Sequence, residues 1–427
     1  MNTIKEYLHS KSGEMTELLR ELVAIPSVQG EAEDGFPFGR EPARALEFML
    51  GKCREAGLVT ENVDNYAGSA DHGNDPELAI LCHLDVVPAG TGWETDPFRL
   101  EYDPATDKLT GRGAIDDKGP AVAALYAVKA IKECGIPLKK GVRLIFGTNE
   151  ENGSADIAYY RTKRELPPMI FTPDGEYPVI NAEKGMLRVY FSAPLTGGIF
   201  RNIAVDNAIN AVPGAVRYTL TGEQNERCCT GTAAHASTPE KGENAVTKLL
   251  SEYRDADPLL AELARLFPHG ETDGKSCGLG FSDEISGKMT CVLSVLSSSG
   301  DSISGGIDIR FPLDQTVFNI SSIICGKLRE AGFTIDSCEG VEPHITPESS
   351  PLVQSLLTAY ERVTGDKGRC IAIGGGTYVH DIPGGVAFGA EFPGSDGLMH
   401  SPGEFITLND LLRNAEIIAH AITEICR

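Results

Sequence analysis

Seven side chains that could ligate a metal or move a proton stand in tight turns or just after short apolar stretches. They are imidazoles and carboxylates, namely His83, Asp85, Asp116, Glu150, Glu151, Asp174 and His400. Such nitrogen and oxygen donors suit zinc or a similar divalent ion. Taken singly, His83 could be a hydrogen-bonded core histidine, and Glu150 and Glu151 could be one more acidic turn in an acidic protein. Several separate strand ends that all carry such groups favour a metal site instead.

His83 and Asp85 are two residues apart at the end of an apolar run. In extended backbone, side chains with this spacing project to the same face. His83 could therefore bind a metal while the Asp85 carboxylate orients its ring, as carboxylate partners of metal-binding histidines do.

The stretch GRGAIDDKG, residues 111–119, combines three glycines with two adjacent carboxylates. The glycines allow the backbone to turn tightly and to approach a neighbouring group closely. Because a carboxylate offers two oxygens, one aspartate here could bridge two metal ions. The simpler interpretation is a strand-to-helix turn in which Asp116 or Asp117 caps the following helix.

The elements around these residues predict an α/β fold with a mostly parallel sheet flanked by helices. Apolar runs of strand length occupy 78–82, 142–146 and 169–171, and 386–388 adds another strand. Helical patterns cover 4–23 with a break near Gly13, the residues after Pro42, 121–134, 351–364 and 408–426. We expect 65–76 to be a polar loop and 89–110 a surface excursion. The polar residues follow the strands, where open α/β sheets place their ligands.

The pattern changes between residues 185 and 345. Alternating stretches such as 187–192 and 303–310 predict antiparallel strands, with helices at 245–253 and 320–328. We therefore predict one domain from residues 1–184 and 346–427, and a smaller α+β domain inserted as residues 185–345.

Composition limits the possible classes of protein. A chain of 427 residues is expected to form two domains, and its formal charge of −23 argues against nucleic acid or anionic membranes as partners. No apolar run reaches the roughly eighteen residues of a membrane span, and the N-terminus lacks a signal-peptide core. The eleven cysteines are scattered without CxxC pairs, so neither a disulfide framework nor a zinc ribbon is indicated. A reducing cytoplasm is the expected location.

Seven motifs stand in the order that is typical of one metallopeptidase family. They are CHLDVVP, GRGAIDDKG, TNEENG, TPDGEYP, AAHASTPEKGENA, GGGTYVHDIP and MHSPGEF. In these motifs the chain resembles metallopeptidase family 20, which includes aminoacylases, acetylornithine deacetylase and glutamate carboxypeptidase. The motifs are most similar to those of the PepV-type dipeptidases. The resemblance implies a zinc-peptidase type catalytic domain with an inserted α+β lid domain.

The resemblance also implies two metal ions bridged by Asp116. One ion would also take His83 and Asp174, and the other Glu151 and His400. Asp85 would orient His83, and Glu150 would be the general base that deprotonates a metal-activated bridging water. The peptide bond between Asp116 and Asp117 is expected to be cis, which is rare outside proline.

Further residues of the family pattern would bind the substrate. His235 matches a lid histidine that donates to the developing oxyanion, although by itself it could be a surface loop histidine. Asn210 and Arg310 match positions that hold the substrate's backbone and carboxylate, for which a guanidinium is well suited. Backbone N–H groups of the loop at Gly375, Gly376 and Thr377 could bind the same carboxylate.

The sequence therefore predicts a dinuclear metal-dependent dipeptidase. Zinc (Zn2+) is the expected metal, and manganese (Mn2+) or cobalt (Co2+) would accept overlapping ligand sets. The expected partner is a dipeptide or another small amide, and the chain would be a monomer or a homodimer. An N-acyl amino acid deacylase or carboxypeptidase of the same family is the alternative activity. A non-catalytic binding protein is the alternative from another class, but no ligand or base of the pattern is missing.

Overall fold

The computed structural model describes residues 3–195, 198–299 and 301–427, and the chain divides into two compact units. Unit 1 comprises Met1–Asn181, Thr346–Ile371 and Thr377–Arg427, and unit 2 comprises Ala182–Ile345 and Ala372–Gly376. The bounds differ from those of the predicted domains, because residues 182–184 and 372–376 belong to unit 2. The roles of the two parts as catalytic and lid domains stay predictions.

Unit 1 is built on a sheet whose strand order is β1-β2-β6-β3-β7-β22-β8. The four central strands β6, β3, β7 and β22 run parallel, and the flanking pairs are antiparallel. Beyond Asn181, β8 continues into unit 2 and pairs with β20. The bounds are β1 Val59–Val63, β2 Ala67–His72, β3 Pro76–His83, β6 Gly141–Gly147, β7 Met169–Thr172, β8 Val179–Glu183, β20 His344–Ile345, β21 Cys370–Ile373 and β22 Val386–Ala387.

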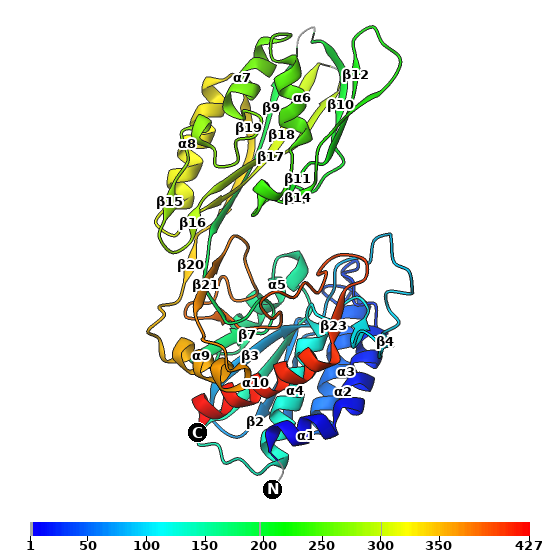
Figure 1. Cartoon of the computed structure of the whole chain (residues 1–427), viewed down its shortest axis with the longest axis vertical. Helices are drawn as coiled ribbons and strands as arrows, with labels where there is room; N and C mark the ends of the chain where they lie inside the picture. The colour runs from blue at the N-terminus through cyan, green and yellow to red at the C-terminus, as the bar shows by residue number, and fades with distance from the viewer. Residues whose placement is uncertain (1–2, 196–197, 300) are drawn as a thin grey trace. The chain divides into compact units, whose positions relative to one another are not determined.

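The strand β3 lies between two apolar cores, which explains why its sequence is apolar without alternation. Leu78, Ile80 and Cys82 enter a core shared with six helices, whereas Ala79 and Leu81 enter a second core on the opposite face. The six helices are α1 Ile4–Ser10, α2 Ser12–Val23, α3 Arg40–Glu55, α4 Lys118–Glu133, α9 Pro351–Thr364 and α10 Leu408–Cys426. Figure 1 shows α4 and α10 side by side, although 274 residues lie between the end of α4 and the start of α10. Helix α5, Ala155–Lys163, contributes to the second core. The predicted α/β class is confirmed.

One expectation about unit 1 is wrong in part, and a second is correct but incomplete. The predicted polar loop at 65–76 contains β2, whose first four residues are buried and which pairs antiparallel to both β1 and β6. Residues 89–110 lie mostly at the surface, as predicted, but they also contain β4 (Glu101–Asp103) and β5 (Lys108–Thr110), and β5 pairs with β23 (Phe405–Thr407). In both cases, pairing with a distant strand overrides a polar, glycine-containing sequence.

Unit 2 is an α+β structure with a seven-stranded antiparallel sheet of order β13-β12-β10-β17-β18-β9-β19. Its strands are β9 Gly185–Pro194, β10 Phe200–Ala204, β12 Ala215–Leu220, β13 Arg227–Thr230, β17 Thr290–Ser299, β18 Ser302–Phe311 and β19 Thr334–Val341. The helices α6 (Ala245–Tyr253), α7 (Pro258–Leu266) and α8 (Val317–Glu330) share a core with this sheet. Two small pairs, β11 (Ala211–Val212) with β14 (Ala234–His235) and β15 (Ser282–Asp283) with β16 (Gly287–Lys288), lie apart from it.

Across the described residues, no helix is both long enough and apolar enough to cross a membrane. All eleven cysteines are free thiols.

Candidate metal centre

The parallel strands of unit 1 bring most of the predicted ligands to one edge of the sheet. His83 is the last residue of β3, and Asp174 stands two residues beyond the end of β7. Glu150 and Glu151 belong to a short 3-10 helix, Glu150–Asn152, that follows β6. Because β6, β3 and β7 are neighbours and run parallel, their carboxyl ends meet.

Asp116 places its two carboxylate oxygens against two different imidazoles. Its Oδ1 lies 2.9 Å from Nε2 of His83, and its Oδ2 lies 2.8 Å from Nε2 of His400. The peptide bond between Asp116 and Asp117 is cis, as predicted. The turn depends on Gly113, which has a φ of +85°, and on Gly119, where a Cβ would lie 2.1 Å from the carbonyl oxygen of Ala114. The tight turn inferred from the glycines is therefore confirmed.

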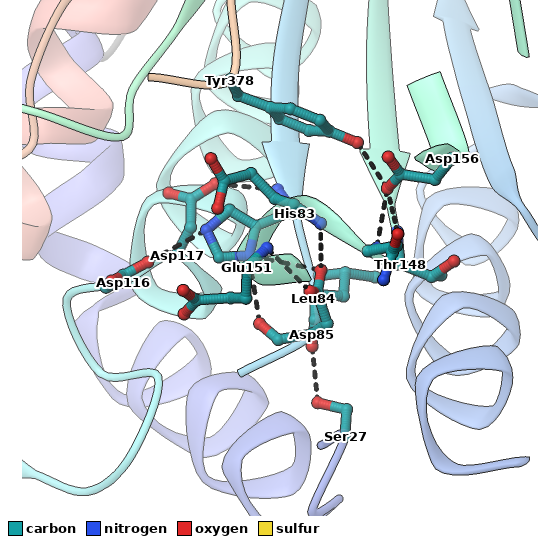
Figure 2. Close-up of polar contacts among 12 residues, drawn as sticks. Ser27, His83, Leu84, Asp85, Asp116, Asp117, Thr148, Glu151, Asp156 and Tyr378 are labelled. Atoms are coloured by element: carbon teal, nitrogen blue, oxygen red, sulfur yellow. Dashed lines mark hydrogen bonds and ion pairs between the residues drawn. The ribbon is translucent and has the colours of Figure 1, made fainter. Parts of the chain in front are cut away.

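Each imidazole also lies close to a second carboxylate. Asp174 Oδ2 is 3.6 Å from Nε2 of His83, and Glu151 Oε2 is 3.1 Å from Nε2 of His400. Donor atoms of His83, Glu150 and Asp174 all lie within 4.8 Å of one another, as do those of His83, Asp116 and Glu151. These two groups of donors share His83, and Asp116 in turn contacts both His83 and His400. Figure 2 shows several of them converging at the end of β3.

The electrostatics of this cluster fit divalent cations. Burial raises the pKa of Glu150, Glu151 and Asp174, and repulsion from the neighbouring carboxylates adds to this. Hydrogen bonds to Asp116 and Glu151 raise the pKa of His400. Carboxylates this close together repel one another strongly at low dielectric, and two divalent ions would offset that repulsion. Imidazole and carboxylate donors are also the ligand types that such ions accept.

Asp85 contacts both His83 and the turn that carries Glu150 and Glu151. Nδ1 of His83 is 3.0 Å from the backbone carbonyl oxygen of Asp85 and 3.5 Å from its carboxylate. The two carboxylate oxygens accept hydrogen bonds from the backbone N–H groups of Glu150, at 3.2 Å, and Glu151, at 3.1 Å. Asp85, the residue predicted to orient His83, therefore holds the turn that carries both glutamates. Figure 2 shows Asp85 beside Glu151.

Asp117 occupies the N-cap position of α4, but its side chain makes no capping hydrogen bond. Its carboxylate instead accepts a 3.0 Å hydrogen bond from the backbone N–H of His83. Burial raises the pKa of Asp117 well above its usual range. The interpretation of the two aspartates as ordinary helix caps is therefore wrong, because both side chains face His83.

Asp156 and Tyr378 complete a buried network that the sequence did not reveal. Oδ2 of Asp156 accepts hydrogen bonds from the N–H groups of Thr148 (2.6 Å) and Asn149 (2.8 Å) and from the hydroxyl of Tyr378 (2.6 Å). The ring of Tyr378 lies edge-on to that of His83, with the centroids 6.1 Å apart (Figure 2). A side chain at Gly147 would collide with this network, since its Cβ would lie 1.7 Å from the Tyr378 hydroxyl.

This network leads to a stability prediction. At pH 8, above the pKa of about 6 to which burial raises Asp156, Tyr378→Phe removes a buried hydrogen bond to a carboxylate. We expect a loss of about 1.5–3 kcal/mol in the free energy of unfolding of unit 1. The measurement is urea unfolding followed by the fluorescence of Trp93, the only tryptophan of the chain.

Tyr159→Phe is the matched control, because its hydroxyl donates to Asp64 at the surface. A surface change of this kind should alter the unfolding free energy by less than about 0.5 kcal/mol. Equal effects of the two substitutions would contradict the prediction.

Two further buried charges, Arg112 and Glu404, lie within the motifs GRGAIDDKG and MHSPGEF. They form an ion pair of 2.5 Å. Their positions within two of the motifs mark both residues as candidates for a role at the site. The sequence does not indicate that they pair, because they are 292 positions apart.

The predicted substrate residues Asn210 and His235 lie side by side in unit 2. The strand β11 pairs with β14, placing Ala211 opposite His235, and the N–H of Ala236 donates to the carbonyl oxygen of Asn210 at 2.8 Å. The imidazole of His235 lies 2.6 Å from the hydroxyl of Ser237. The role of His235 as an oxyanion donor stays a prediction.

Arg310 has internal partners in unit 2. Its guanidinium binds both oxygens of Asp308, at 2.5 and 3.0 Å, and donates to the carbonyl oxygen of Gly374 at 3.1 Å. Its side chain is only 3% exposed, and its bond to Gly374 supports the start of the glycine loop. Gly375 and Gly376 belong to unit 2, whereas Thr377 begins the next stretch of unit 1. Their roles in binding a substrate stay predictions.

The chain is similar to known proteins of one peptidase family. Residues 79–424 match the model of peptidase family M20/M25/M40. The chain is 34% identical to the putative dipeptidase YtjP of Bacillus subtilis, with 96% of each chain covered. It is 33% identical to the Beta-Ala-Xaa dipeptidase of Lactobacillus delbrueckii subsp. lactis, with 99% of this chain and 98% of that protein covered.

The crystal structure of human carnosine dipeptidase 1 has a similar fold. The TM-score is 0.68 at 17% sequence identity, over 99% of this chain and 98% of that chain. The match to the family model covers most of the sequence, and both curated relatives align over nearly their whole length. The chain therefore belongs to peptidase family M20/M25/M40, a family of metal-dependent hydrolases that act on peptide bonds.

Proposed function

We propose that the protein is a dinuclear metal-dependent dipeptidase. The observation that carries this proposal is the position of Asp116, whose two oxygens lie at 2.9 and 2.8 Å from the imidazoles of His83 and His400. Asp174 adds a carboxylate on the side of His83, and Glu151 adds one on the side of His400. One carboxylate between two donor groups is an arrangement that suits two neighbouring ions.

When bound, the two divalent ions would activate a water molecule and polarise the scissile carbonyl. In the proposal, Glu150 accepts a proton from the attacking water and returns it to the nitrogen of the leaving amine. A general base must stay within hydrogen-bonding reach of that proton. The bond from the backbone N–H of Glu150 to Asp85 supports this role, because it fixes the start of the turn on which the carboxylate stands.

The names of the two curated relatives support dipeptides as the substrate class. In the proposal, Asn210 and the backbone of Gly375, Gly376 and Thr377 hold the substrate's backbone and carboxylate. Arg310 supports the loop through its bond to Gly374. Zinc is the proposed metal because imidazole and carboxylate are among its usual ligands.

The test compares one dipeptide in three forms: free, N-acetylated and C-amidated. Metal-stripped protein should be inactive and should recover when zinc or manganese is restored. A pocket that binds both charged ends should lose a charged hydrogen bond with each block, worth about 1.5–3 kcal/mol. The expected result is a decrease in kcat/KM of about tenfold or more for each block.

Other results would select the alternatives. A better rate with N-acetyl amino acids would replace the dipeptidase by a deacylase, and release of C-terminal residues from longer peptides would indicate a carboxypeptidase. Binding of dipeptides without turnover, with two ions bound, would indicate a non-catalytic binding protein.

A further inference from the structure

A buried ion pair connects the turn that carries Asp116 to the loop that carries His400. Arg112 and Glu404 are 1% and 0% exposed, and Nη1 of the arginine lies 2.5 Å from Oε2 of the glutamate. Arg112 stands four residues before Asp116, and Glu404 stands four residues after His400. The pair therefore spans 292 residues of sequence to join two segments that both supply proposed ligands.

The second oxygen of Glu404 binds the backbone at Asp116 itself. Oε1 accepts hydrogen bonds from the N–H groups of Ile115, at 3.1 Å, and Asp116, at 3.3 Å. The backbone carbonyl oxygen of Glu404 accepts a further bond from the N–H of Gly111, at 2.9 Å. The glutamate thus holds the 111–116 turn at both of its ends.

Stability alone is a poor explanation of this pair. Burying two charges is costly, and apolar residues of similar volume often serve the fold equally well. Nε of Arg112 has no hydrogen-bond partner among the described residues, which adds to that cost. The guanidinium lies over the ring of Trp93, 5.4 Å from its centroid, so packing holds it in one place. What an apolar pair could not supply is an acceptor for the N–H groups of Ile115 and Asp116.

We infer that Glu404, held in place by Arg112, is a positioning residue that sets the metal affinity of the site. It does so by fixing the backbone of Asp116 relative to the loop of His400. The inference rests on the proposed function, because Asp116 and His400 are proposed ligands. Outer-shell partners of metal ligands typically contribute about 10–100-fold in metal affinity.

Two double variants separate positioning from a general structural role. Arg112→Met with Glu404→Leu and Arg112→Met with Glu404→Gln both remove the charges and the contact of the guanidinium with Trp93. They differ at Oε1, because glutamine retains an acceptor for the two N–H groups and leucine does not. Zinc affinity is measured on metal-stripped protein by competition with a chromogenic chelator, without substrate. We expect the leucine variant to bind zinc about 10–100-fold more weakly than the glutamine variant.

A second readout is kinetic. Raising the zinc concentration should restore the kcat of the leucine variant, which a loss of folded protein would not allow. If the leucine variant does not fold, Glu404→Asp takes its place, because the shorter side chain draws the carboxylate away from the two N–H groups. It should bind zinc about tenfold or more weakly than the unmodified protein.

The outcomes are distinct. Equal zinc affinities for the two double variants would overturn the inference, as would an unchanged affinity for a folded Glu404→Asp variant. A failure of the unmodified protein to bind two zinc ions would instead reject the proposed function.

Discussion

Replacing Asp116 by alanine is expected to remove both metal ions and, with them, the hydrolytic activity. Its two oxygens face His83 and His400 separately, so no other side chain of the cluster replaces it. Bound ions provide several kcal/mol of transition-state stabilisation, and each 1.4 kcal/mol corresponds to about a factor of ten. The expected decrease in kcat/KM is therefore at least about 10³-fold.

Elemental analysis after desalting measures the bound ions directly. Asp71→Ala is a matched control, because Asp71 is a partly buried carboxylate of the same unit that pairs with Arg143. It should keep both ions. Asp116→Asn preserves the size of the side chain and serves if the alanine variant is unstable. Two tightly held ions in either Asp116 variant would show that the bridging assignment is wrong.

Glu150→Gln should keep both ions and lose most of the turnover. General acid–base groups contribute about 10²–10⁴-fold in rate, and an amide cannot accept the proton. Its backbone bond to Asp85 is unaffected by the substitution, so the turn should remain in place. The expected result is a decrease in kcat within that range and an unchanged content of metal.

The neighbouring substitution Glu151→Gln is the internal comparison. Glu151 lies 3.1 Å from His400, so its replacement should deplete one ion rather than remove a base. Metal content and kcat are measured on both variants with the same preparation of ions. The distances by themselves leave Glu150 within reach of Asp174 and His83. Metal loss in the Glu150 variant alone would therefore exchange the two assignments.

The elements that the sequence predicts well are those whose signals are local. Residues 351–364 were expected to be helical, and α9 has these bounds, because Ser350 caps the N–H of Val353 and Gly365 ends the helix at a φ of +76°. The strand β3 was predicted from a run that is buried on both faces.

One element that was missed, the strand β2, depends on distant pairing. The strand β2 contains Gly68 and Ser69, which favour a loop, yet it is held between β1 and β6. Helix α7 was not predicted although Asp257 caps it and Pro258 stands in its first turn. For α7, the local signals of a helix start are present, but the helix has only nine residues and its pattern does not stand out from the neighbouring loop.

The same distinction holds at the site. Residues such as His83 and Asp174 could be found because they follow strands, where α/β sheets bind ligands. The bond from Tyr378 to Asp156 spans 222 residues, and that from Arg112 to Glu404 spans 292. No periodicity or spacing predicts such pairs, since they arise only when separate segments pack together. For the same reason, the sequence did not predict the hydrogen bonds that the Asp85 carboxylate accepts from the backbone of Glu150 and Glu151.

The order of the elements along the chain also matters while the protein is being synthesised. His83, Asp116, Glu150, Glu151 and Asp174 all leave the ribosome within the first 181 residues, but His400 and helix α10 come last. Until then, the apolar face of β3 lacks one of the helices that cover it, and the proposed second ion lacks its imidazole. Unfinished copies would therefore lack one proposed ligand and would expose apolar surface of the kind that makes incomplete chains prone to aggregation.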